Sequence, residues 1–110
     1  MINGDEVWQI LQQESAPKLV VLDWMMPGMT GIDVLHKLRE KENKENKRTY
    51  VIMLTAKATQ EDIQTAREAG ANDYINKPYK QSYLLDRIKL GEQKLSQQHL
   101  QEEIISIQSV

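Results

Sequence analysis

The stretch LVVLDWMMPGMTG, residues 19–31, decides the fold of this chain. Its first four residues are all apolar, which is typical of a strand buried on both faces of a parallel sheet. This strand ends on Asp23, and a loop that contains Pro and Gly follows it. Because ligands of open α/β sheets bind beyond the carboxyl ends of the strands, Asp23 is a candidate site residue. An aspartate at a strand end is also a common turn former or helix cap, so both interpretations remain open at this point.

The composition is that of one small soluble domain. The chain has 110 residues, of which 40% are apolar and 27% are charged. A net charge of −2 gives no general electrostatic reason to bind nucleic acid or an anionic membrane. The chain contains no cysteine, which excludes disulfides and Cys-based metal sites. No apolar run approaches the ~20 residues that cross a bilayer, and the polar residues 3–6 argue against a secretory signal, so we expect a cytoplasmic protein.

Helix and strand patterns alternate along the first half of the chain. Residues 3–5 predict the start of a first helix, and Thr30-Gly31 predicts the start of a second one. Residues 39–48 are rich in Lys, Glu and Asn, and we expect them to form a solvated helix end and a loop. The apolar residues 51–54 predict a second buried strand, which ends on Thr55.

The alternation continues in the second half. Thr59 is a predicted N-cap for a third helix, and Gly70 is its predicted left-handed C-cap. Residues 73–76 predict a short third strand that ends on Lys77-Pro78. A last helix is predicted from about Gln81 almost to the C-terminus.

Such an alternation predicts parallel strands joined by right-handed crossovers. Asp23, Thr55 and Lys77 then follow the carboxyl ends of three successive strands and face one crevice. A carboxylate, a hydroxyl and an ammonium group at one sheet edge suit phosphoryl chemistry. The carboxylate can act as the nucleophile, while the other two groups can neutralise and hydrogen-bond a transferred phosphoryl group.

Three motifs now resemble the response regulator receiver domain of two-component signalling. They are residues 23–31, the segment Leu54-Thr55-Ala56, and residues 69–78. Their order and spacing make the resemblance far more specific than any single short motif. It covers about residues 1–90 and implies a flavodoxin-like, doubly wound parallel α/β sheet. The implied domain is therefore a partial receiver over residues 1–90, followed by a C-terminal helical extension or linker over residues 91–110.

The resemblance implies a role for each matched site residue. Asp23 would accept a phosphoryl group, Thr55 would hydrogen-bond it, and Lys77 would pair with one of its oxygens. Ala56 would leave room for the group. Thr55 and Tyr74 would be the two switch residues, because Tyr74 would change its rotamer when Thr55 moves toward the phosphate. The bond before Pro78 is expected to be cis, which is a modest cost of ~0.5–1 kcal/mol for an X–Pro bond.

The resemblance also implies a magnesium ion, held by Asp23, by the backbone carbonyl of Met25 and by an acidic pair on the family's first strand. That pair has no counterpart here, because the chain resembles the family only from its second helix onward. The first strand, first helix and second strand are lacking, so the metal site is incomplete and magnesium binding is expected to be weak. Asp5 and Glu6 are expected to lie in a helix start away from the strand ends, where they cannot replace the pair.

Two functions of different classes remain open. The first is a phosphorelay receiver, not an enzyme, in which Asp23 takes phosphate from a sensor histidine kinase or phosphotransfer protein and switches an output surface. The second is a phosphate-silent interaction or oligomerisation module. In either case, the lack of the family's first two strands leaves residues 19–22 as an open edge strand and the last helix only partly covered. These two surfaces predict a homo-oligomer. An output domain is expected after the last helix.

Several other residues have more than one interpretation. Trp24 is either a ligand platform or a residue that packs locally beside the site. The methionines at 25, 26 and 29 suggest adaptable packing. His36 and His99 are expected at the surface. Lys77 is alternatively a Schiff-base lysine, although nothing else indicates a carbonyl substrate. Phosphatases with an Asp nucleophile carry a second Asp two residues later. This chain has Met25 at that position, which argues against that class of enzyme.

Overall fold

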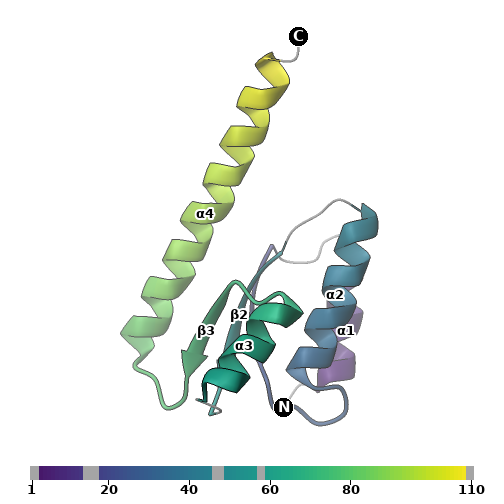
Figure 1. Cartoon of the computed structure of the whole chain (residues 1–110), viewed down its shortest axis with the longest axis vertical. Helices are drawn as coiled ribbons and strands as arrows, with labels where there is room; N and C mark the ends of the chain where they lie inside the picture. Colours follow the sequence, from purple (N-terminus) through teal and green to yellow (C-terminus); the bar gives the residue numbers. More distant parts are fainter. Residues whose placement is uncertain (1–2, 14–17, 46–48, 57–58, 109–110) are drawn as a thin grey trace. The chain divides into compact units, whose positions relative to one another are not determined.

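The computed structural model describes residues 3–13, 18–45, 49–56 and 59–108. The predicted alternation of helices and strands is confirmed within these ranges. Each predicted strand agrees with an observed one to within about a residue at either end. In chain order the elements are α1 (Gly4–Leu11), β1 (Leu19–Asp23), α2 (Gly31–Glu45), β2 (Tyr50–Thr55), α3 (Gln60–Ala69), β3 (Asp73–Asn76) and α4 (Gln81–Gln108) (Figure 1).

The three described strands form a parallel sheet in the order β1-β2-β3. Leu22 is aligned with Met53, and Met53 with Tyr74, so these residues lie in one row across the sheet. Each connection between neighbouring strands passes through a helix, as a parallel pair requires. The predicted α/β fold with a parallel sheet is confirmed.

The helices α1, α2 and α3 cover one face of this sheet. Val51 and Met53 lie two residues apart on β2, so their side chains point to the same face of the sheet. There they join residues of all three helices in one apolar cluster. The central strand β2 is buried along its whole length. The cluster consists of Leu11, Leu22, Trp24, Val34, Leu35, Leu38, Val51, Met53, Ala66 and Ala69.

Local capping signals position α3 as predicted. The Thr59 side chain accepts a hydrogen bond from the backbone N–H of Asp62 at 3.2 Å and donates one to its carboxylate at 2.7 Å. Gly70 ends the helix with φ of 107°, in the left-handed region that glycine adopts without strain. Both predicted caps of this helix are confirmed.

Two charged residues of α2, Arg39 and Glu42, differ from the solvated helix end expected for residues 39–48, of which residues 46–48 lie outside the described part of the chain. Arg39 and Glu42 form an ion pair of 2.6 Å, and their side chains are only 13% and 6% exposed. Arg39 also donates hydrogen bonds to the carbonyl oxygens of Gly70 and Thr49 and to the side chain of Asn72. The expectation was wrong for these two charges because their partners come from segments distant in the sequence.

The chain divides into two compact units, with the boundary between Tyr79 and Lys80. The second unit contains α4, a continuous helix of 28 residues (green to yellow in Figure 1). This helix runs through residues 90 and 91, where the sequence suggested that the receiver ends and an extension begins. That boundary stays a prediction. In the described part of the chain, no helix is both long enough and apolar enough to cross a membrane.

Candidate functional site

Backbone hydrogen bonds bring the ends of the three strands to one edge of the sheet. The N–H of Trp24 donates to the carbonyl of Leu54 at 2.9 Å, and the N–H of Lys77 donates to the carbonyl of Thr55 at 2.8 Å. The parallel ladder therefore continues past each strand end. As a consequence Asp23, Thr55 and Lys77 follow one another across the carboxyl edge of the sheet, as the sequence predicted.

An ion pair joins two of these residues directly. The ammonium group of Lys77 donates a hydrogen bond to Oδ2 of Asp23, across 54 positions of sequence. The other carboxylate oxygen accepts the backbone N–H of Met25 at 3.1 Å, so Asp23 also forms the turn that follows β1. Both side chains remain about a third exposed, at 36% for Asp23 and 37% for Lys77. The carboxylate is thus fixed on both oxygens and is still open to solvent.

Thr55 and Tyr74 form the more buried side of the site. Thr55 is buried at the end of β2, and the neighbouring Ala56 is exposed. Burial raises the pKa of the Tyr74 hydroxyl above its ordinary value, a hydrogen bond with the Thr55 side chain lowers it in part, and the charge of Asp62 adds to the rise. The two predicted switch residues are therefore linked by a hydrogen bond in this structure.

Two backbone features fix the loops around the site. A Cβ atom on Gly31 would clash with the backbone oxygen of Asp23 and lie 2.9 Å from Cα of Trp24, so α2 begins directly against the end of β1. The N–H of Gly31 donates to the carbonyl of Trp24 at 2.8 Å in the same contact. The Lys77–Pro78 peptide bond is cis, the geometry that the resemblance implies.

The start of α1 lies beside the site loop, contrary to expectation. The N–H of Gly4 donates to the carbonyl of Pro27 at 3.1 Å. Oδ2 of Asp5 lies 2.5 Å from the position that a Cβ atom would take on Gly28. Glu6 belongs to the same first turn, where its backbone N–H donates to the Asn3 cap. The prediction that Asp5 and Glu6 lie away from the strand ends was wrong, because α1 begins at the loop that directly follows β1.

This arrangement still does not complete a magnesium site. Magnesium prefers six oxygen ligands in near-octahedral geometry. Asp23 and the Met25 carbonyl are the protein ligands that the resemblance implies, and both carboxylate oxygens of Asp23 already accept hydrogen bonds. Across residues 3–13, 18–45, 49–56 and 59–108, no group of three or more His, Cys, Asp or Glu side chains is arranged to hold a metal. The described residues therefore do not fit a magnesium site built by protein groups alone.

The remaining candidate residues are distributed as follows. Trp24 is buried and packs edge-on against Tyr74, which is the local packing interpretation. Met26 and Met29 pack on the core, whereas Met25 is exposed and departs from the expected packing role. His36 is exposed on α2. The side chain of His99 lies outside the part of the chain whose side chains are described.

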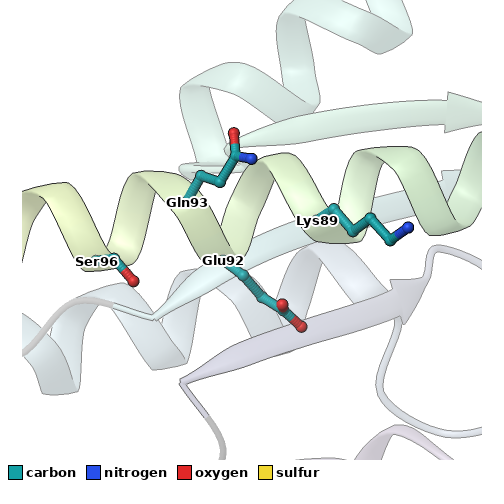
Figure 2. Close-up of a pocket in the computed structure, with 4 residues that line it drawn as sticks. All are labelled: Lys89, Glu92, Gln93 and Ser96. Atoms are coloured by element: carbon teal, nitrogen blue, oxygen red, sulfur yellow. The ribbon is translucent and has the colours of Figure 1, made fainter.

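A hollow on α4 lies outside these predictions. Figure 2 shows its lining residues, which all come from this one helix and are all polar: Lys89, Glu92, Gln93 and Ser96. Their spacing of three and four residues places them on neighbouring turns. No motif in the sequence predicts a ligand at this position, and the hollow contains none of the predicted site residues.

Comparison with known proteins agrees with this geometry. The family model of the response regulator receiver domain matches residues 1–89. The phosphate regulon transcriptional regulatory protein PhoB of Rhizobium meliloti is 38% identical over 89 residues, which are 81% of this chain and 38% of PhoB. The DNA-binding response regulator MtrA of Mycobacterium tuberculosis is 43% identical over 77 residues, which are 70% of this chain and 32% of MtrA. The chain thus spans less than half the length of these relatives.

Solved structures of the same type are also similar. The receiver domain of the Francisella response regulator 1452 superposes with a TM-score of 0.75 and 29% identity, over 86% of this chain and 74% of that one. The CheY-like receiver domain protein of Methanospirillum hungatei gives a TM-score of 0.71 and 28% identity, over 90% and 73% of the two chains. The fold, the strand-end residues and the family match lead to one conclusion, that this chain belongs to the response regulator receiver domain family.

Proposed function

We propose that Asp23 accepts a phosphoryl group from a phosphohistidine on a sensor histidine kinase or a phosphotransfer protein. The observation that carries this proposal is the ion pair between Lys77 and Asp23 at the carboxyl edge of the sheet. The Asp23 carboxylate is about a third exposed and is therefore accessible to a bulky donor, and the adjacent cation can offset the charge that the donor brings.

The transfer is a substitution at phosphorus. An Asp23 oxygen forms a bond to the phosphorus atom while the phosphorus–nitrogen bond of the donor breaks. The electron pair of that bond stays on the imidazole nitrogen, and the product is an acyl phosphate on Asp23. Lys77 moves from the carboxylate to a phosphoryl oxygen, and the Thr55 hydroxyl donates to another oxygen. The small side chain of Ala56 leaves space for the group.

Thr55 and Tyr74 would transmit the change. Thr55 bonds to the Tyr74 side chain in this structure, so a Thr55 that turns toward a phosphoryl group gives up that contact. Tyr74 is then free to change its position beside α3. Such a change in the population of two Tyr74 positions would alter the surface that an output partner contacts.

Magnesium has a limited place in this proposal. In family members with a complete site the ion neutralises phosphoryl charge, and here Asp23 and the Met25 carbonyl would be its protein contacts. Because the described residues do not form a complete site, we expect weak magnesium binding and slow phosphorylation of this chain by itself.

One observation favours a second candidate function. Both oxygens of Asp23 are occupied, by Lys77 and by the backbone of Met25, and the described residues hold no group of three or more His, Cys, Asp or Glu side chains arranged to bind a metal. A receiver-derived module that does not accept phosphate and acts through binding or oligomerisation fits the same geometry.

The relatives suggest the cellular setting. They are named as a transcriptional regulatory protein and a DNA-binding response regulator. We propose that α4 leads toward an output domain of such a protein, that the receiver unit itself binds neither nucleic acid nor membrane, and that it works in the cytoplasm.

Phosphorylation with a small donor tests the proposal directly. Incubation of the chain with acetyl phosphate and magnesium should add one phosphoryl group to Asp23, far more slowly than to a receiver with a complete metal site. Mass spectrometry of the intact chain and its peptides measures both the extent and the position. Asp23→Ala should abolish the modification, while the matched control Asp86→Ala removes an exposed acid on α4 and should leave it unchanged.

The possible results separate the two functions. Modification of Asp23 supports the phosphoacceptor, and rapid, stoichiometric, magnesium-dependent modification rules out the phosphate-silent module. A chain that stays unmodified while a complete receiver reacts in parallel contradicts the phosphoacceptor and favours the silent module.

A further inference from the structure

Trp24 occupies a central position that the proposed phosphoryl transfer does not use. It follows Asp23 directly, and its backbone N–H donates to the carbonyl of Leu54, the residue before Thr55, at 2.9 Å. Its side chain is buried in the apolar cluster between the sheet and the helices. The indole is therefore held firmly, with its backbone fixed to β2 and its ring fixed by the core.

The indole also contacts the switch tyrosine. The rings of Trp24 and Tyr74 lie with centroids 6.5 Å apart and planes at 87°. This edge-to-face arrangement is the favourable one for two aromatic rings, because the positive edge of one ring meets the negative face of the other. Tyr74 is thus held at two points, by the Trp24 ring along its side and by Thr55 at its hydroxyl.

We propose that Trp24 is a positioning residue that holds Tyr74 in its inward position next to Thr55. The proposal rests on the switch described under the proposed function, and adds a second contact to it. Thr55 responds to the group on Asp23, whereas Trp24 is part of the fixed core and cannot follow. The edge contact with Trp24 therefore sets how readily Tyr74 leaves once Thr55 has turned away.

A weaker Trp24 contact should change the resting state of the switch. A side chain in two positions divides between them according to their free-energy difference, and loss of a contact made in only one position shifts the division toward the other. Removal of the indole should consequently move Tyr74 outward even when Asp23 carries nothing. The same change should make a later response to phosphate smaller, since part of the movement has already occurred.

The experiment follows Tyr74 in the full chain. The protein is labelled with ring-¹³C tyrosine, and the Tyr74 signal is assigned by its loss in Tyr74→Phe. Spectra are recorded for the parent chain, Trp24→Phe and Trp24→Leu, with circular dichroism and thermal unfolding of each. Trp8→Leu is the matched control, because Trp8 packs on the same core from α1.

In both Trp24 variants the Tyr74 signal should shift toward that of an exposed tyrosine, further in Trp24→Leu than in Trp24→Phe. It should stay in place in Trp8→Leu. A general loss of packing would move the signal in the control as well, so that result contradicts the proposal. An unchanged Tyr74 signal in folded Trp24→Phe contradicts it also, whether or not Trp24→Leu folds.

A second set of spectra tests the role of Trp24 separately from the proposed phosphoryl switch. Beryllofluoride with magnesium serves as the phosphoryl mimic, and it should shift the Tyr74 signal in the parent chain and less in the Trp24 variants. If the mimic leaves the Tyr74 signal of the parent chain unchanged, the proposed phosphoryl switch is contradicted. The shift of the Tyr74 signal in the Trp24 variants without the mimic remains a separate test of the contact between Trp24 and Tyr74. An equal response of parent and variants to the mimic overturns the role of Trp24 in the switch.

Discussion

Two ion pairs of this chain, Asp23–Lys77 and Arg39–Glu42, both have short N–O contacts but differ in how far their side chains are exposed to solvent. The side chains of Asp23 and Lys77 are each more than a third exposed, and pairs of that kind contribute about 0–1 kcal/mol to stability. The side chains of Arg39 and Glu42 are nearly buried, so each depends on the other to offset the loss of hydration. The first pair therefore adds little to folding, whereas the second is part of the fold.

This contrast predicts different effects of removing each cation. Arg39→Met should lower the free energy of unfolding by about 3–5 kcal/mol, because the buried Glu42 loses its cationic partner and keeps only the backbone N–H of Thr49. Arg39→Lys should fall between, since a single ammonium cannot reach all the oxygens that the guanidinium contacts. Lys77→Met should change stability by about 1 kcal/mol or less. Urea unfolding measures all three, with the exposed Arg67→Met as control, and equal losses for Arg39 and Arg67 would refute the argument.

Tyr74 predicts a dependence of stability on alkaline pH. Its ordinary pKa is 10.0, and burial raises the pKa in the folded chain. Above that ordinary value the unfolded chain loses the proton while the folded chain retains it, so stability is complete below about pH 10 and falls as the pH rises toward the folded-state pKa. Unfolding experiments at pH 8 to 11 should show a smaller decline for Tyr74→Phe than for the parent chain. Parallel declines would contradict a raised pKa.

At the scale of helices and strands, the features set by local sequence were predicted correctly, whereas contacts between residues distant in the sequence were not predicted. The apolar run before Asp23 and the caps Thr59 and Gly70 act within a few residues, so the sequence alone identified them. The strand-end site followed from the alternation of elements. The buried contacts of Arg39 and the edge contact of Trp24 with Tyr74 depend on partners far along the chain, which no periodicity reveals.

The junction between β1 and α2 gives a prediction at this scale. A methyl group at Gly31 would meet the backbone of Asp23 and Trp24, and backbone cannot move aside as a flexible side chain does. Gly31→Ala should therefore destabilise the chain by about 1–3 kcal/mol, as overpacking commonly does. Thermal or urea unfolding measures the loss against His36→Ala, an exposed position on the same helix. An alanine that is tolerated as well at 31 as at 36 would show that the two elements can separate without cost.

At the scale of the whole molecule, β1 and β3 are the edge strands of the sheet that the described residues form. In the described residues β1 pairs with β2 alone, and the predominantly apolar β1 is only partly buried. An apolar edge strand offers unpaired backbone groups to another chain. The unit that contains α4 adds a long helix with Leu84, Ile88 and Leu95 at coiled-coil spacing, and such spacing favours pairing of helices.

These two surfaces predict a homodimer or a larger oligomer. Burial of ~400 Å² of apolar surface returns ~10 kcal/mol at ~25 cal/mol per Å², against association costs of ~4–15 kcal/mol. The balance is close, and helix pairing adds to the favourable side. Sedimentation velocity at micromolar concentration should report more than one chain per particle. Leu95→Glu should shift the particle toward monomer if α4 forms the contact, with the exposed Lys94→Glu as its control, and Val21→Lys should do so if the edge of β1 forms it. A folded monomer at all concentrations would contradict the prediction, because it would mean that the chain protects the edge of β1 by itself.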